Sequence, residues 1–178
     1  AKAQYWEQLP AMPITNYGGY TIHRSLYAGL TGTGVLLAND SVYVFNDNSP
    51  TATWDDGASL PQPPSRYGTV SFMHDIYPYV IGGMNTDSTY YGDLWRRDWF
   101  MQWTELAPLP APGRAWAVGA QLDGILYYGL GNNNASNDWW AYDIATDTWA
   151  PRTAFPGGAR QGASCFTVNN KIYVGLGA

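Results

Sequence analysis

"GRAWAVGAQLDGILYYGLG" occupies residues 113–131, and "ARQGASCFTVNNKIYVGLG" follows at residues 159–177. Both stretches run from an arginine through a strand of small residues, a two-residue turn and an aromatic strand to a closing glycine. The turn pairs, Asp123-Gly124 and Asn169-Asn170, are typical of tight β-hairpins because Gly and Asn tolerate positive φ. The chain therefore repeats a hairpin unit at an interval of 46 residues.

Tryptophan marks the same repeat along the rest of the chain. Four tryptophans recur at spacings of 48, 49 and 46 residues, and each begins a segment that ends in prolines or glycines: Trp6, Trp54, Trp103 and Trp149. An arginine follows the last three tryptophans after 11 or 12 residues, and a glycine closes each unit 17 residues after its arginine. The first unit deviates, with Tyr17 or Gly18 in the arginine position. The spacing predicts four repeats, approximately residues 7–54, 55–103, 104–149 and 150–178, the last of them partial.

Each complete unit contains short apolar runs separated by turn residues. In the third unit these runs are "AWAVGAQL", "ILYYGLG", "DWWAYDI" and "TWAPRT", and the chain has no stretch of ten or more residues with helical periodicity. A four-stranded sheet cannot bury both faces alone, whereas sheets stacked radially cover one another in a β-propeller. We therefore predict one all-β domain, residues 1–178, in which three full four-stranded antiparallel blades and a partial blade form a propeller segment. The full blades should end near Trp54, Trp103 and Trp149, which we interpret as packing between blades.

The third unit resembles the kelch repeat. The matching residues are Arg114, Asp123, Gly124, Tyr127, Gly131, Asp138, Tyr142, Asp143 and Trp149. The second unit matches at Arg66, Gly82, Gly83, Asp93 and Trp103, and the first matches weakly at Gly29, Asp40, Tyr43 and Trp54. The third and fourth units carry "GLG" in place of the family's double glycine. The resemblance implies a kelch-type β-propeller, and it leaves the function open because kelch propellers serve many unrelated tasks.

The resemblance also implies which loops share a face. In kelch blades the connection between the second and third strands lies on the same face as the connection from one blade to the next. Here that face would gather residues 59–66, 83–92, 108–114 and 132–137, which are long, polar and tipped with aromatic side chains. Loops held by a rigid scaffold are common binding sites, so we take this face as the candidate ligand-binding surface.

Eight residues are candidate ligand contacts: Arg66, Arg114, Arg160, Asn85, Tyr90, Asn132, Asn133 and Trp116. The three arginines occupy one equivalent position per blade, near the start of the strand expected to line the central channel. They could form a ring of guanidinium groups that faces a carboxylate, a peptide or an acidic sugar. The alternative, which their repetition favours, is that each arginine ties down its neighbouring loop through hydrogen bonds to carbonyl oxygens.

The sequence offers no convincing catalytic or metal-binding set. His23 and His74 fall in the same turn of adjacent units, where a separation of roughly 10 Å or more prevents them from sharing a metal ion. Cys165 has no histidine pair to support the copper radical chemistry of some kelch relatives, and the two glutamates, Glu7 and Glu105, both follow tryptophans on outer strands. We therefore expect no catalytic residues, no cofactor and no metal, and we regard an enzyme as the less favoured option.

The amino-acid composition excludes some classes of binding partner and cellular location. The formal net charge is −5 and the only lysines are Lys2 and Lys171, which argues against a nucleic-acid-binding surface. No apolar run is long enough to span a membrane, and the single cysteine excludes an intrachain disulfide. Because "AKA" at residues 1–3 resembles a signal-cleavage site, export to the periplasm or beyond in a bacterium is slightly favoured over a cytoplasmic location.

Two classes of function remain. The favoured one is a non-catalytic interaction module that binds a protein partner, or another copy of the chain, through its loop face and open blade edges. The alternative is a carbohydrate-recognising propeller that binds an acidic sugar, either lectin-like or similar to the bacterial kelch mutarotases that handle sialic acid. The chain opens on an expected fourth strand at residues 4–10 and closes after a second strand at residues 171–178. A third strand is missing between them, so we expect an incomplete propeller that other chain segments complete. Either the chain is a piece of a longer polypeptide, or another subunit fills its open edges in an oligomer or larger assembly.

Overall fold

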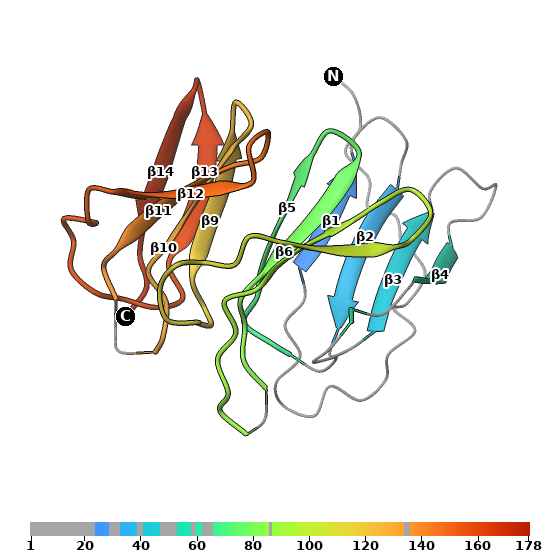
Figure 1. Cartoon of the computed structure of the whole chain (residues 1–178), viewed down its shortest axis with the longest axis horizontal. Helices are drawn as coiled ribbons and strands as arrows, with labels where there is room; N and C mark the ends of the chain where they lie inside the picture. Colours follow the sequence, from blue (N-terminus) through green and yellow to red (C-terminus); the bar gives the residue numbers. More distant parts are fainter. Residues whose placement is uncertain are drawn as a thin grey trace, which may run out of the picture.

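The computed structural model consists of strands, turns and loops, and the residues that it describes contain no helix (Figure 1). The described residues are 24–28, 33–38, 41–46, 53–57, 60–61, 66–85, 87–133 and 136–178, and the first four of these ranges are described by their backbone alone. His23 and the fourth strand expected at residues 4–10 lie outside them.

Three antiparallel sheets have four strands each, in sequential order. Blade 1 contains β1 (Arg24–Ala28), β2 (Thr33–Ala38), β3 (Ser41–Asn46) and β4 (Thr53–Gly57). Blade 2 contains β5 (Val70–His74), β6 (Tyr77–Ile81), β7 (Leu94–Arg97) and β8 (Trp103–Leu106). Blade 3 contains β9 (Val118–Leu122), β10 (Ile125–Gly129), β11 (Trp139–Asp143) and β12 (Thr148–Arg152). A two-stranded sheet, β13 (Ser164–Val168) with β14 (Lys171–Gly175), forms the terminal hairpin.

The first strands of successive sheets lie next to one another. β1 contacts β5, β5 contacts β9, and β9 contacts β13. The sheets are therefore arranged side by side around their first strands, as blades are in a propeller (Figure 1). The predicted fold class is confirmed, and Trp54, Trp103 and Trp149 lie in β4, β8 and β12 as expected for the ends of three blades.

The tight turns form where the sequence places residues that accept positive φ. Asp123 and Gly124 have φ values of 51° and 78°, and Asn169 and Asn170 have φ values of 49° and 59°. Two consecutive residues in this region give a turn whose twist matches that of the flanking strands. The turn residues thus fix the pairing of β9 with β10 and of β13 with β14.

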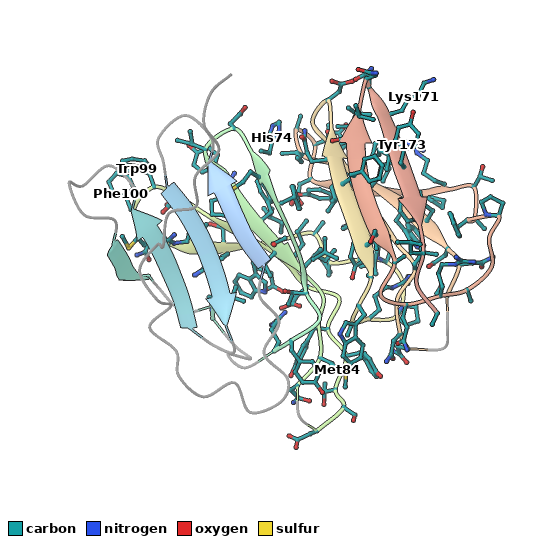
Figure 2. All side chains as sticks on the ribbon, turned by 180° about the vertical axis from the view of Figure 1, so that it is seen from behind. His74, Met84, Trp99, Phe100, Lys171 and Tyr173 are labelled. Carbon is teal, nitrogen blue, oxygen red and sulfur yellow. The ribbon has the colours of Figure 1, made fainter. Side chains whose placement is uncertain are left out.

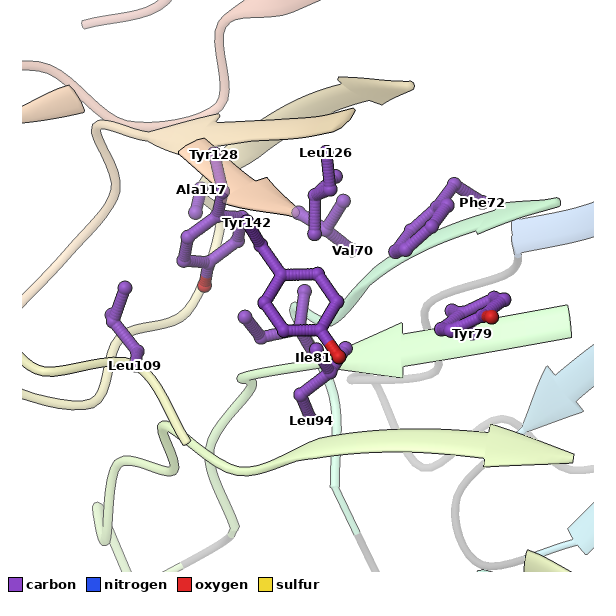
Figure 3. Packing of buried hydrophobic residues seen from close by; sticks show 10 residues of the cluster. All are labelled: Val70, Phe72, Tyr79, Ile81, Leu94, Leu109, Ala117, Leu126, Tyr128 and Tyr142. Atoms are coloured by element: carbon purple, nitrogen blue, oxygen red, sulfur yellow. The ribbon is translucent and has the colours of Figure 1, made fainter. Parts of the chain in front are cut away.

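The main buried core lies between blade 2 and blade 3 (Figure 3). Phe72 and Tyr79 stack across β5 and β6 with their ring centroids 4.7 Å apart, and Leu126 and Tyr142 of blade 3 belong to the same buried cluster. Trp149 packs against this cluster, with its ring centroid 5.0 Å from that of Tyr142. The position of Trp149 is the one expected for a repeated inter-blade tryptophan, whereas the Trp54 side chain is outside the described residues.

Hydrogen bonds join the outer parts of the same two blades. Trp149 Nε1 donates to the Ala107 carbonyl oxygen at 2.7 Å, and the Ala107 amide donates to Asp147 Oδ1 at 2.8 Å. Tyr142 also donates its hydroxyl to Asp147 Oδ1, at 2.7 Å. Burial, reinforced by the hydrogen bond and charge of Asp147, raises the pKa of Tyr142 above its ordinary value, so the hydroxyl remains a donor at neutral pH.

Candidate functional site: the loop face and the open hairpin

The loops that connect second to third strands, and the connections between blades, meet at one end of the blades. We call this end the loop face; the described residues of its four segments are 82–85 with 87–93, 107–117, 130–133 with 136–138, and 153–163. The Gly83 amide donates to the Arg114 carbonyl oxygen at 2.8 Å, and the Gly131 amide donates to that of Arg160 at 2.8 Å. Met84 of this face lies at the opposite end of the molecule from His74 and Lys171 (Figure 2). The four segments therefore form one continuous surface.

Arg66 is held by a carboxylate within its own blade. Its guanidinium makes two hydrogen bonds to Asp93, of 2.7 and 2.9 Å, and a third to the Gly82 carbonyl oxygen at 3.3 Å. The Arg66 side chain is fully buried, and the Tyr91 ring packs 4.4 Å from its guanidinium carbon. Paired and buried in this way, Arg66 connects the start of blade 2 to the loop before β7.

Arg114 repeats this arrangement in blade 3. It binds both carboxylate oxygens of Asp138, with Nη2 at 2.9 Å from Oδ2, and donates to the Leu130 carbonyl oxygen at 3.3 Å. Burial alone would raise the pKa of Asp138, but hydrogen bonds from Arg114, Ser136 and Trp140, with the Arg114 charge, outweigh it and lower this pKa to about 2. Asp138 is therefore ionised at every physiological pH, and Arg114 has a structural partner.

Arg160 occupies the equivalent position in the terminal hairpin but has different partners. Its Nη1 donates to the Leu176 carbonyl oxygen at 3.1 Å, and its Nη2 donates to the Gly157 carbonyl oxygen. Within the described part of the chain no carboxylate forms an ion pair with it. Arg160 is partly exposed, with the Phe155 ring 5.1 Å from its guanidinium carbon.

The remaining candidate residues stiffen the loop face and connect its loops. Asn85 accepts two backbone hydrogen bonds through Oδ1, from Asp87 at 3.0 Å and Thr89 at 2.9 Å. The Tyr90 hydroxyl donates to Asn132 Oδ1, and Asn133 Nδ2 donates to the Gly113 carbonyl oxygen at 2.7 Å. The Asn85 bonds order its own loop, and the Tyr90 and Asn133 bonds join the loops of blades 2 and 3.

Trp116 lies where the inter-blade connection enters blade 3. Its φ of 49° is in the left-handed region, and its ring centroid is 5.7 Å from that of Tyr67 in the preceding blade. Its amide donates to the Gly68 carbonyl oxygen at 2.9 Å, and its own carbonyl accepts from the Gly162 amide at 3.0 Å. Trp116 therefore joins equivalent segments of three successive units.

A cavity of about 380 Å³ opens on the loop face beside the terminal hairpin. The structure brings three of the predicted residues together there. Its lining is Gly131, Asn132, Asn133, Ala159, Arg160, Gln161 and Ala178. The other five predicted residues do not line it. Amide and guanidinium groups make this cavity suited to hydroxyl or carboxylate groups.

His74 lies on the opposite end of the blades and connects them. Its Nδ1 is 3.2 Å from Gln121 Nε2 of blade 3, and its Nε2 is 3.7 Å from Asp75 Oδ2. Among the described residues, no three histidine, cysteine, aspartate or glutamate side chains lie close enough to hold a metal ion. The same part of the chain has no helix of the length and apolar character that a membrane span requires.

The terminal hairpin exposes an aromatic face. Phe166 of β13 and Tyr173 of β14 are cross-strand partners, and their rings stack with centroids 5.3 Å apart. Phe166 is 58% exposed and Tyr173 is 44% exposed. Val168 on the same face is also exposed. This surface, defined by Phe166, Val168 and Tyr173, is called the open face below.

Leu176, just after β14, is a further exposed apolar side chain at the end of the same hairpin. It has a φ of 62°, and its equivalent in blade 3, Leu130, has a φ of 59°. Leu130 is fully buried, whereas Leu176 is 76% exposed. A left-handed leucine costs conformational energy that burial can offset, and in this structure only Leu130 receives that compensation.

The fold and these surfaces define the chain as a segment of a β-propeller with four-stranded antiparallel blades. No family model and no curated protein matches the chain. Among solved structures, it is similar to the one titled "Structure of YjhT", with a TM-score of 0.75 and 18% sequence identity. The similarity covers 93% of this chain and 59% of that one, so this chain spans about three-fifths of its length. At such low identity the likeness establishes the fold alone.

Sequence reasoning missed the carboxylate partners of the arginines. Asp93 and Asp138 each precede the third strand of their blade by one residue, and each lies more than 20 residues after its arginine. Both aspartates were part of the recognised repeat, so their recurrence beside repeated arginines was the available signal. Pairing them required the three-dimensional path of each blade.

Proposed function

We propose that this chain is a non-catalytic interaction module that binds polypeptide through the open face of its terminal hairpin. The observation that carries the proposal is the exposure of the stacked Phe166–Tyr173 pair, whose equivalent in blade 2, Phe72–Tyr79, is buried by the next blade. Exposed apolar groups gathered on one surface are typical of protein interaction sites. A β-sheet packed on the open face would cover it as blade 3 covers blade 2.

Light scattering across a range of concentrations tests this function. We expect the 178-residue chain to self-associate weakly and to bind a hydrophobic dye, because the open face is uncovered. The double variant Phe166→Ser/Tyr173→Ser should be monomeric and bind less dye. Trp99→Ser/Phe100→Ser is the matched control, since these aromatics are 76% and 80% exposed in the β7–β8 turn, away from the open face. A monomer whose dye binding does not depend on Phe166 and Tyr173 would overturn the proposal.

A second candidate function is recognition of a carbohydrate at the loop-face cavity. It is supported by the convergence of Asn132, Asn133 and Arg160 on one opening of about 380 Å³. An acidic sugar would present hydroxyl groups to the amides and a carboxylate to the guanidinium. A thermal-shift series with neutral and acidic sugars tests it. Stabilisation by acidic sugars that Arg160→Gln abolishes supports this candidate, and no shift with any sugar rejects it.

A further inference from the structure

We propose that the free edge of β14 accepts an antiparallel strand that begins Asp-x-Trp, and that the carboxylate of this strand pairs with Arg160. The strand comes from polypeptide outside residues 1–178. The inference rests on the proposed function, because it treats the terminal hairpin as an assembly site, and it names the chemistry of the partner. The two complete blades for which side chains are described provide the template.

In both of these blades an aspartate immediately precedes the third strand and binds an arginine and a tryptophan. Asp93 immediately precedes β7, binds Arg66 through both oxygens, and accepts a hydrogen bond from Trp95 Nε1. Asp138 immediately precedes β11, binds Arg114 through both oxygens, and accepts a 2.7 Å bond from Trp140 Nε1. In blade 2 and again in blade 3, an Asp-x-Trp sequence at the start of the third strand therefore supplies the carboxylate that pairs with the arginine of that blade.

Arg160 is positioned to receive the same partner. In blades 2 and 3, Nη1 of the arginine donates to the carbonyl oxygen 16 residues further on, at 3.3 Å in each case. Arg160 makes the same contact with Leu176, at 3.1 Å. The guanidinium is thus fixed at its usual place in the blade, while the carboxylate that completes this contact in the other blades is absent from the described residues.

The register of the sheets places the incoming aspartate beside this guanidinium. The residue that follows the aspartate pairs with Ile81 in blade 2 and with Gly129 in blade 3. The equivalent residue in the terminal hairpin is Gly175, which pairs with Ser164 of β13 and with no other described strand. A strand added in the same register would therefore place its aspartate one residue beyond Gly175, at the Leu176 carbonyl that Arg160 already contacts.

The chain's own Asp-x-Trp sequences cannot supply this strand to another copy while it stays folded. They begin at Asp93, Asp138 and Asp147. The first two bind Arg66 and Arg114, and Asp147 accepts hydrogen bonds from Ala107 and Tyr142. Residues 1–23 contain no aspartate at all. The partner is therefore a different stretch of polypeptide, whose first aspartate is not already bound to another residue.

A synthetic peptide that copies residues 136–152, "SNDWWAYDIATDTWAPR", serves as the probe, and a second peptide carries Asp138→Asn. Fluorescence anisotropy measures the binding of each labelled peptide to the wild-type chain, to Arg160→Gln and to Arg152→Gln. Arg152 is the matched control because it lies exposed on the outer strand β12.

We expect the aspartate peptide to bind the wild-type chain and Arg152→Gln equally. Removing the charged pair from either side should weaken binding by about 10- to 100-fold, because charge-assisted hydrogen bonds of this kind are strong. The asparagine peptide should lose nothing further on Arg160→Gln, as a double-mutant cycle requires of direct partners.

Binding that is unaffected by both Asp138→Asn and Arg160→Gln would overturn the inference and leave the proposed function standing. A complete absence of peptide binding would also overturn it. The proposed function is judged separately, by the dependence of self-association and dye binding on Phe166 and Tyr173. Failure of one proposal can therefore be told from failure of the other.

Discussion

Two aromatic pairs occupy equivalent positions in this chain and have opposite surroundings. Phe72 and Tyr79 join β5 to β6 and are 6% and 2% exposed, while Phe166 and Tyr173 join β13 to β14 and are 58% and 44% exposed. The local structure is the same, since both pairs stack across an antiparallel hairpin. The difference is the blade that covers the first pair. It shows that local sequence builds each hairpin, whereas burial depends on the neighbouring sheet.

The largest expected effect comes from truncating one aromatic of each pair. Phe72→Ala should lower the free energy of unfolding by about 3–5 kcal/mol, because it leaves a cavity between packed blades. Phe166→Ala should lower it by no more than about 0.5 kcal/mol, as is usual for exposed positions. Urea unfolding followed by tryptophan fluorescence measures both. Equal losses would mean that the open face is covered in solution.

The arginines provide the second comparison. Arg114→Gln should lower the free energy of unfolding by about 3 kcal/mol, because it leaves the half-buried Asp138 carboxylate without its cation. Arg160→Gln should cost about 1 kcal/mol, since only hydrogen bonds to carbonyl oxygens are lost. The midpoints of urea unfolding compare the loss of stability in the two variants. A larger loss for Arg160→Gln would contradict the absence of a partner carboxylate.

Acid should weaken the blade that contains Asp138. The pKa of this carboxyl is lowered from 3.8 to about 2 in the folded chain, so its stabilising contribution is fully present above pH 3.8 and is lost as the pH falls towards 2. Thermal unfolding of wild-type protein and Asp138→Asn between pH 2 and pH 5 tests this. The variant should be less stable at pH 5, and its disadvantage should shrink as the pH falls. A constant difference across this range would exclude the linkage.

The smallest effect is expected at Leu176, and Leu130, the other left-handed leucine, provides the comparison. Leu176→Gly should change the free energy of unfolding by less than about 1 kcal/mol, in the stabilising direction, because glycine relieves the left-handed φ and little burial is lost. Leu130→Gly should instead destabilise the chain, since a fully buried side chain is removed. Melting temperatures of both variants distinguish these signs. Destabilisation by Leu176→Gly would show that Leu176 is already buried in solution.

Much of the fold could be predicted because short-range sequence features determine where its turns and strands form. The Asp123-Gly124 and Asn169-Asn170 turns, and the spacing of Trp103 and Trp149, fixed the hairpins and the blade ends without reference to distant residues. The alternative in which each arginine ties down its neighbouring loop describes part of what Arg66 and Arg114 do, since both donate to loop carbonyls.

The ion-pair partners, the exposed aromatic pair and the cavity could not be predicted, because they depend on contacts between distant parts of the chain. The carboxylates that hold Arg66 and Arg114 lie 27 and 24 residues further along the sequence, immediately before the third strand of each blade. The exposure of Phe166 and Tyr173 depends on what lies against the hairpin, so no local pattern reveals it. Of the eight candidate residues, only Asn132, Asn133 and Arg160 line one cavity, because the loops fold back on one another.

The central claim is the proposal that the edge of β14 accepts a further strand, and hydrogen exchange of single backbone amides tests most directly whether this edge is free. In a hairpin closed by a two-residue turn, alternate amides point outward, which here are those of Ile172 and Val174. Their equivalents in blade 3, Leu126 and Tyr128, face β11. We predict that Ile172 and Val174 exchange at least about 100-fold faster than Leu126 and Tyr128. Equal protection at all four amides in the isolated chain would contradict the account.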